Sequence, residues 1–160
     1  MIQFLIICVG GIKEDYLQKG ILEYTKRIQK YAKIDVVEIS ESRLPDHPSD
    51  KLIEKALEEE ALKIMSIIPE QATLVTLEIE GAMYSSIDFS KFIEKNATYE
   101  SSKIVFVIGS SYGLSSEIKS KSQYSISFSK MTFPHQLMRF ILFEQIYRAM
   151  TIIKNTTYHK

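Results

Sequence analysis

The chain has 160 residues, which suits a single domain over residues 1–160 with a sizeable core of its own. With 45 % hydrophobic and 25 % charged residues, its composition is that of a soluble globular protein. No apolar run approaches the roughly 20 residues that cross a bilayer, and no secretory pattern opens the chain, so a cytoplasmic protein without a membrane segment is expected. One cysteine, Cys8, excludes a disulfide framework, and the three scattered histidines give no metal-binding spacing.

The net charge of zero conceals an uneven distribution of charge along the chain. Residues 1–100 contain 12 Lys and Arg against 18 Asp and Glu, whereas residues 101–160 contain 8 against 2. A polyanionic partner would be attracted to the second part and repelled by the first. Chance clustering on solvated faces would give the same numbers, but the asymmetry coincides with an unusual C-terminal segment.

Strand-like and helix-like patterns alternate along the chain. Continuous apolar runs are typical of strands buried on both faces, whereas apolar residues at helical spacing indicate helices. Ser49 is a candidate N-cap of the second helix, as Ser85 or Ser86 is of the third. In chain order the patterns predict a strand over 2–9, a helix over 15–31, a strand over 34–39, a helix over 50–67, a strand over 73–79, a helix over 86–96, a strand over 103–108, a short helix over 115–122, a strand over 124–129 and a long helix over 135–154.

This alternation predicts an α/β protein with a mainly parallel sheet of five to six strands and helices on both faces. Ligands of such folds bind beyond the carboxyl ends of the strands. The stretch 109–113, Gly-Ser-Ser-Tyr-Gly, is neither a P-loop nor a dinucleotide fingerprint, so a nucleotide triphosphatase or an ordinary NAD enzyme is not expected. No G-x-S-x-G elbow is present, and Cys8 lies within a buried strand pattern. The segments at the strand ends are Gly10-Gly11, 77–81, 109–114 and 128–133.

The last quarter of the chain, residues 125–160, is its most informative segment. Pro134 stands where the first turn of a helix tolerates proline. The long helix that follows is apolar around more than one face, which indicates packing on both sides, yet it carries Arg139 and Arg148. The chain then ends on Tyr158-His159-Lys160. A helix of this kind is expected to carry a site.

Several segments together resemble one family in their order and spacing. They are 74–81 (Leu-Val-Thr-Leu-Glu-Ile-Glu-Gly), 107–114 (Val-Ile-Gly-Ser-Ser-Tyr-Gly-Leu), 127–135 (Ser-Phe-Ser-Lys-Met-Thr-Phe-Pro-His), 144–149 (Glu-Gln-Ile-Tyr-Arg-Ala) and the closing Tyr-His. The family is that of the small SPOUT methyltransferases, which modify N3 of a pseudouridine in the 23S rRNA of the large ribosomal subunit. The resemblance covers essentially the whole chain.

The resemblance implies an α/β knot, with the C-terminal part threaded through a loop as a trefoil knot, and a homodimer. It also implies S-adenosylmethionine (SAM) as the methyl donor, without a metal. Loop backbone groups can bind the adenine edge, and apolar side chains can enclose the ring and the methionine chain. Carried over by position, the SAM contacts fall on Leu77, Gly109, Phe128, Ser129, Lys130, Met131, Thr132 and Phe133.

A reaction at N3 needs particular residue types, because the N3–H group must lose its proton and the methyl group must be held in line with N3. A cation beside the ring would stabilise the developing anion, and a base would take the proton. By residue type, Arg148 is the candidate cation, His159 the candidate base and Tyr158 a candidate stacking or hydrogen-bonding partner for the nucleobase. His135 is a weaker candidate, for orienting the substrate or pairing with phosphate. A neutral chain attracts naked RNA poorly, so the assembled ribosome is the expected substrate.

One departure from the family pattern opens an alternative. The family usually has a second glycine where this chain has Ser110, and serine would be strained if the backbone there needs a positive φ. A catalytically inactive ribosome- or RNA-binding module of the same fold is the rival interpretation. The alternation alone would also permit a flavodoxin-like small-molecule-binding domain.

Two features near the C-terminus have structural interpretations as well. Instead of contacting phosphate, Arg139 could pair with an acid across the dimer or extend from the apolar face to water. The tail around Tyr158-His159 would ordinarily be a frayed end, and it is expected to become ordered when RNA or the partner subunit is present.

Overall fold

The computed structural model describes all of residues 1–160 as alternating strands and helices. The alternation expected from the sequence is confirmed, with ten elements in the predicted order. The strands are β1 (Gln3–Val9), β2 (Lys33–Ile39), β3 (Thr73–Met83), β4 (Lys103–Ile108) and β5 (Tyr124–Ser127). The helices are α1 (Asp15–Ile28), α2 (Asp50–Ile67), α3 (Ser86–Tyr99), α4 (Ser116–Lys121) and α5 (His135–Ile153).

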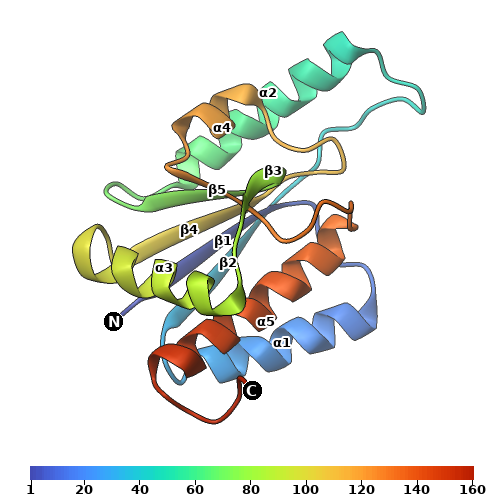
Figure 1. Cartoon of the computed structure of the whole chain (residues 1–160). Coiled ribbons are helices and arrows are strands. Elements are labelled where there is room, and N and C mark those ends of the chain that lie inside the picture. Colours follow the sequence, from blue (N-terminus) through green and yellow to red (C-terminus); the bar gives the residue numbers. More distant parts are fainter.

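The five strands form one parallel sheet in the order β2-β1-β4-β3-β5. Figure 1 shows helices α1, α3 and α5 on one face of this sheet and α2 and α4 on the other. The α/β class with a parallel sheet covered on both faces is therefore confirmed. Because all strands run the same way, their carboxyl ends meet at one edge, where ligands of such folds bind.

Each face of the sheet has its own apolar core, and β4 contributes to both. Its side chains alternate, with Ile104, Phe106 and Ile108 in the core beneath α1, α3 and α5, and Val105 and Val107 in the core beneath α2 and α4. Every one of these five side chains is buried. The apolar run of this strand is continuous because successive side chains point alternately into the two cores.

Three helices begin at serine N-caps, two of which the sequence predicts. The Ser49 hydroxyl accepts from the Leu52 N–H at 3.3 Å, and that of Ser85 from the Asp88 N–H at 3.0 Å. Ser115 caps α4 in the same way. These bonds satisfy N–H groups that have no partner within the helix. Of the two candidates for α3, the cap is Ser85.

Two strand ends differ from the sequence prediction, and both lie at the carboxyl edge. Strand β3 continues to Met83, four residues beyond the predicted end at residue 79. Its register against β5 shifts, so that Leu77 and Ala82 both pair with Ile126 and the intervening residues bulge out. Strand β5 ends at Ser127 instead of residue 129, which releases two residues into the following loop. The carboxyl ends of β3 and β5 are thus set by the pairing of these two strands with each other.

Two helix ends differ from the prediction by three residues. Helix α1 ends at Ile28, and the chain continues in turns in which the Tyr31 and Ala32 N–H groups both donate to the Ile28 carbonyl. Tyr31, which the sequence pattern placed in the helix, therefore lies in these turns, and its ring packs against Tyr147. Helix α3 runs on to Tyr99, three residues past its predicted end.

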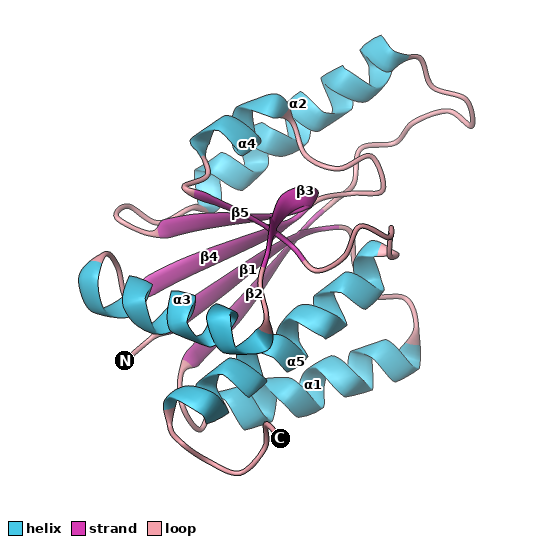
Figure 2. Ribbon diagram, in the orientation of Figure 1, coloured by secondary structure: helices cyan, strands magenta, loops and turns pink.

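Helix α5 lies between its neighbours α1 and α3, which Figure 2 shows on either side of it. Its fully buried residues, among them Leu142, Phe143, Ile146 and Met150, recur every three or four positions and form one face. Half-buried side chains beside this face, such as Phe140, pack against Tyr24 of α1. This arrangement accounts for the apolar residues around more than one face. None of the helices has the length and apolar character needed to cross a membrane.

Candidate active site

A pocket of about 900 Å³ opens at the carboxyl edge of the sheet. Its wall is built from three places far apart in the sequence: the bulged part of β3, the loop after β4, and the segment from the end of β5 into the first turn of α5. The bulge of β3 and the early end of β5 supply two of these wall segments. The lining comprises residues 77–80, 108–114, 126–129 and 132–135, with Lys119 and Met138.

Most of the residues expected to contact SAM line this pocket. Lys130 and Met131 do not, and the Met131 side chain is 72 % exposed. These two residues lie in a turn that is closed by a hydrogen bond from the Met131 N–H to the Ser129 hydroxyl at 2.9 Å. The six residues that the structure brings together are Leu77, Gly109, Phe128, Ser129, Thr132 and Phe133.

The loop after β4 contains a glycine that no other residue could replace without a shift. A Cβ at Gly109 would collide with the carbonyl group of Gly113, so the two ends of the loop touch through backbone atoms. The Gly113 N–H donates to the Ser110 carbonyl at 2.9 Å, and Gly113 takes the positive φ of the loop, +86°. Ser110 has no positive φ. The departure from the family pattern therefore does not strain the backbone.

Glu78, which the sequence analysis did not single out, places a carboxylate in the pocket wall. Its side chain is 17 % exposed and accepts hydrogen bonds from the hydroxyls of Thr76 at 2.6 Å and Ser125 at 2.7 Å. Burial acts to raise the pKa of Glu78, but the hydroxyl donors and Lys119, 3.5 Å away, outweigh it and leave the pKa lowered. The wall thus carries a stable negative charge. Glu78 could have been found in the sequence as the first charged residue after the apolar run of this strand.

His135, at the start of α5, also lines the pocket. It lies against Gly10, where an added Cβ would be 3.2 Å from the histidine Nε2. Pro134 stands at the N-cap, one position before the first helical residue. The weaker candidate of the sequence analysis is thus a pocket residue.

Arg139 forms an ion pair within its own chain. It is 5 % exposed, and its Nη2 donates to the Gly10 carbonyl at 3.0 Å and to Glu38 Oε2 at 3.2 Å. The expectations that it pairs across a dimer, reaches water or contacts phosphate are therefore wrong, because both partners come from the ends of β1 and β2. Its role is to fix α5 to the sheet.

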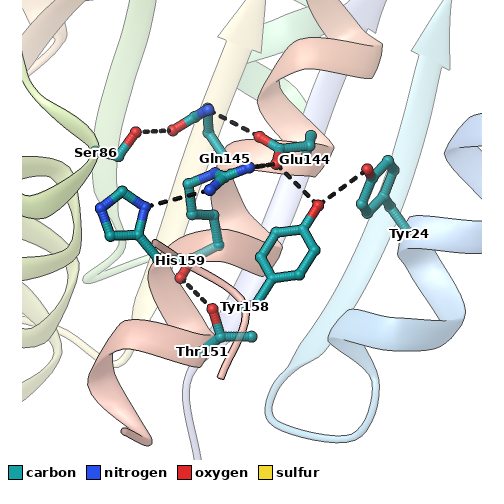
Figure 3. Close-up of polar contacts among 8 residues, drawn as sticks. Tyr24, Ser86, Glu144, Gln145, Thr151, Tyr158 and His159 are labelled. Carbon is teal, nitrogen blue, oxygen red and sulfur yellow. Dashed lines mark hydrogen bonds and ion pairs between the residues drawn. The ribbon is translucent and has the colours of Figure 1, made fainter. Parts of the chain in front are cut away.

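Arg148, Tyr158 and His159 form a second group, at the other end of α5 (Figure 3). The Arg148 guanidinium lies 4.7 Å from the centre of the Tyr158 ring, and its Nη1 is 3.2 Å from His159 Nδ1. We call these three residues, together with Glu144, the C-terminal cluster. The structure brings the three sequence candidates into mutual contact.

Glu144 is the centre of the C-terminal cluster, and the sequence analysis had assigned it no role of its own. Its Oε1 accepts from Arg148 Nε at 3.0 Å and from the Tyr158 hydroxyl at 3.1 Å. Its Oε2 accepts from Gln145, whose amide oxygen in turn accepts from Ser86 at 2.7 Å. The hydrogen bond to Glu144 raises the pKa of Arg148, and burial raises that of Tyr158. Arg148 therefore stays charged and Tyr158 neutral.

The tail is packed on its own chain. Asn155 adopts a positive φ of 53°, and the Thr156 N–H then donates to the Thr151 carbonyl at 2.9 Å, which turns the chain back. The Tyr158 ring packs on Tyr147 at 4.7 Å between centres, and its hydroxyl lies 3.3 Å from that of Tyr24. The tail is thus ordered without RNA or a partner subunit, contrary to expectation.

The pocket and Arg148 of the C-terminal cluster lie at different positions along α5. Thirteen helical positions, about 20 Å at 1.5 Å per residue, separate Arg148 from His135 in the pocket wall. Met138, the last pocket residue on α5, is ten positions, or about 15 Å, from Arg148.

A parallel α/β sheet with a pocket formed by the loops after its last three strands is the arrangement expected of a SPOUT methyltransferase. The chain belongs to this class: a family model described as predicted SPOUT methyltransferase matches residues 2–159.

Within the class, the chain is 47 % identical over 155 residues to the ribosomal RNA large subunit methyltransferase H of Bacillus pumilus (strain SAFR-032). That match covers 97 % of this chain and 98 % of the relative. Among solved structures, a probable methylase family protein from Haemophilus influenzae Rd KW20 superposes with a TM-score of 0.51 at 14 % identity. The superposition covers 99 % of this chain and 70 % of the Haemophilus influenzae chain. At this low identity the likeness shows the fold alone.

Proposed function

We propose that this protein is a cytoplasmic, SAM-dependent methyltransferase that methylates N3 of a pseudouridine in 23S rRNA. The observation that carries the proposal is the full-length match, at 47 % identity, to a ribosomal RNA large subunit methyltransferase. The unstrained Ser110 removes the one sequence feature that favoured an inactive module. We also infer from family membership that the C-terminal part is threaded as a trefoil knot.

The pocket fits SAM in size and chemistry. Small-molecule sites commonly enclose roughly 300–1,000 Å³, and this one has about 900 Å³. The side chains of Leu77 and Phe133 offer apolar surface, and the close-packed loop at Gly109 offers backbone groups at short range. The Glu78 carboxylate provides negative charge for a ligand that carries a positive sulfonium. When bound there, SAM supplies an electrophilic methyl group.

We further propose that the active form is a homodimer in which each pocket is completed by the partner's C-terminal cluster. The separation of about 20 Å along α5 prevents one chain from supplying both halves of a site. In a two-fold dimer the same two patches meet twice, so one antiparallel arrangement would complete both pockets. Exposed apolar side chains at the end of β3 and the start of α3, Met83 and Ile87, are available to such an interface.

In that composite site, Arg148 stabilises the anion that forms when N3 loses its proton. Its guanidinium is charged, partly buried and held by Glu144 on one side, which leaves Nη1 directed toward His159. A fixed cation of this kind stabilises developing charge without reorganising. The Tyr158 ring beneath the guanidinium keeps it in place.

The assembled ribosome is the proposed substrate. The chain is neutral overall, and its cations are concentrated in residues 101–160, so the general attraction to naked RNA is weak. Recognition of a particle would come from shape and from local contacts near the C-terminal cluster. Equal methylation of naked 23S rRNA and of 70S ribosomes would contradict this part of the proposal.

The decisive test is mass spectrometry of 23S rRNA from cells with and without this protein. The expected result is one methyl group missing from one pseudouridine, which returns when the wild-type chain is supplied and does not return with Arg148→Ala. Calorimetry with SAM distinguishes the methyltransferase from the rival interpretation. A chain that binds no SAM and leaves the rRNA unchanged is an RNA-binding module.

A further inference from the structure

The contact between Arg148 and His159 determines which ring nitrogen of the histidine carries the proton. Arg148 Nη1 lies 3.2 Å from His159 Nδ1. A guanidinium has N–H donors and no acceptor, so in this contact the histidine nitrogen must accept. Nδ1 therefore holds a lone pair, and the proton of the neutral ring is on Nε2.

The arginine is fixed in this orientation by the rest of the C-terminal cluster. Two of its nitrogens, Nε and Nη2, donate to Glu144 Oε1, which leaves Nη1 to face His159. Glu144 is itself held through its second oxygen by Gln145. The ring of His159 thus meets an N–H donor that is held in place by Glu144.

The other ring nitrogen of His159 is unoccupied. Nε2 makes no hydrogen bond within the chain, and Figure 3 shows it pointing away from the C-terminal cluster. Donation from Arg148 to Nδ1 withdraws electron density from the ring and so strengthens the Nε2–H group as a donor. An Nε2 that carries a hydrogen cannot accept a proton.

The geometry points to His159 as a hydrogen-bond donor to a carbonyl oxygen beside N3 of the target base, in place of the general base that its residue type suggests. This assignment rests on the proposed function. N3 of pseudouridine lies between two carbonyl groups, so the negative charge left by its proton spreads onto both oxygens. A fixed N–H donor at one of them acts as an oxyanion hole does.

The reaction then balances without a protein base. The N3–H bond breaks and its proton passes to solvent water, and the electron pair stays on the imide. That pair forms the bond from N3 to the methyl carbon while the bond from this carbon to sulfur breaks, with its electrons retained by sulfur. His159 and Arg148 lower the energy of the anion throughout and exchange no proton.

The first test is ¹⁵N NMR of the histidine rings in the wild-type protein, which reports the tautomer directly and needs no activity. His159→Gln identifies the signals, and His47→Gln, in an exposed loop, is the matched control. The expected result is a protonated Nε2 and a bare Nδ1. A proton on Nδ1 would overturn the assignment, whatever the enzyme methylates.

The second test compares His159→Gln with His159→Ala in ribosome methylation. The amide of glutamine supplies an N–H close to the position of Nε2, but it is no base. We expect His159→Ala to reduce kcat by about 100-fold relative to the wild type. We expect the kcat of His159→Gln to be at least about tenfold higher than that of His159→Ala, with the pH profile of the wild type. SAM affinity, measured by calorimetry, should be equal in all three proteins.

Glutamine that is no more active than alanine would overturn the donor role. So would a glutamine variant that lacks an ionisation present in the wild-type profile, because this would identify His159 as the base. If the wild-type enzyme itself leaves ribosomes unmethylated, the proposed function fails and the catalytic role falls with it. The NMR result separates these cases, since the tautomer is read without substrate.

Discussion

Single residues decide the chemistry of the pocket, and Glu78 is the clearest case. It follows the buried run of β3, and its charge is maintained by two hydroxyl donors and a lysine. The carboxylate faces a pocket proposed for a cationic ligand. A buried charge near a sulfonium acts through a lower effective dielectric than water, so its contribution exceeds that of a surface pair.

Glu78→Gln should therefore weaken SAM binding by about tenfold, measured by calorimetry, because the amide keeps the size of the side chain and removes its charge. Glu70→Gln, on an exposed turn, is the control and should bind SAM like the wild type. Because the pKa of Glu78 is lowered, its charge persists through neutral pH, and SAM affinity should fall only on acidification below the ordinary glutamate range, about 4.3. Unchanged affinity in Glu78→Gln would show that the carboxylate does not act on the ligand.

Gly109→Ala is expected to reduce SAM affinity by tenfold or more, about 1.4 kcal/mol, since the added methyl group would displace the Gly113 backbone. Ser110→Gly, the neighbouring change toward the family pattern, should have little effect because Ser110 needs no positive φ. Calorimetry on both variants measures the difference. An affinity loss confined to Ser110→Gly would reverse this account of the loop.

At the scale of elements, local patterns predict type and order well. The cap at Ser49 and the bounds of β4 follow from a few neighbouring residues. The errors occur where an element is ended by a distant partner. Strand β3 continues because Ala82 pairs with Ile126, more than forty residues away, and no local signal in the Glu80-Gly81 turn residues reveals that pairing.

Removal of residues 155–160 is a prediction about the tail as an element. The truncated chain should bind SAM with wild-type affinity, because no residue of the tail lines the pocket. It should methylate ribosomes at less than about one hundredth of the wild-type rate, because Tyr158 and His159 are lost. Calorimetry and single-turnover kinetics give the two readouts. A loss of SAM binding would contradict this, because it would show that the tail helps to hold SAM as well as the target base.

At the scale of the whole molecule, α5 joins two half-sites that it also keeps apart. Its first turn borders the pocket, and its last turns carry Arg148 toward the tail. The ion pair between Arg139 and Glu38 and the packing of Phe143 hold the helix rigidly against the sheet. In the proposed homodimer, the partner therefore supplies the Arg148 that lies about 20 Å along α5 from His135 at each pocket.

Mixed dimers test this arrangement. Chains with Gly109→Ala, which disables the pocket, are combined with chains carrying Arg148→Ala, which disables the C-terminal cluster. Each mixed dimer then holds one intact pocket facing one intact cluster, so random mixing should restore about a quarter of wild-type activity. Each variant alone should retain no more than about a tenth of wild-type activity when the SAM concentration is well below the wild-type Kd. Absence of activity in the mixture, with dimers verified by ultracentrifugation, would mean that both halves act within one chain.

The sequence alone determined the alternation of strands and helices, the two cores, the serine caps and the segments that end at the carboxyl edge. These follow from short-range periodicity and from the propensities of neighbouring residues. Only the tertiary structure decided that Glu78 lies in the pocket, that Arg139 is paired with Glu38 and that Arg148 directs its free nitrogen at His159. The partner of a charged side chain depends on which distant backbone segments pack side by side, and local patterns do not contain that information.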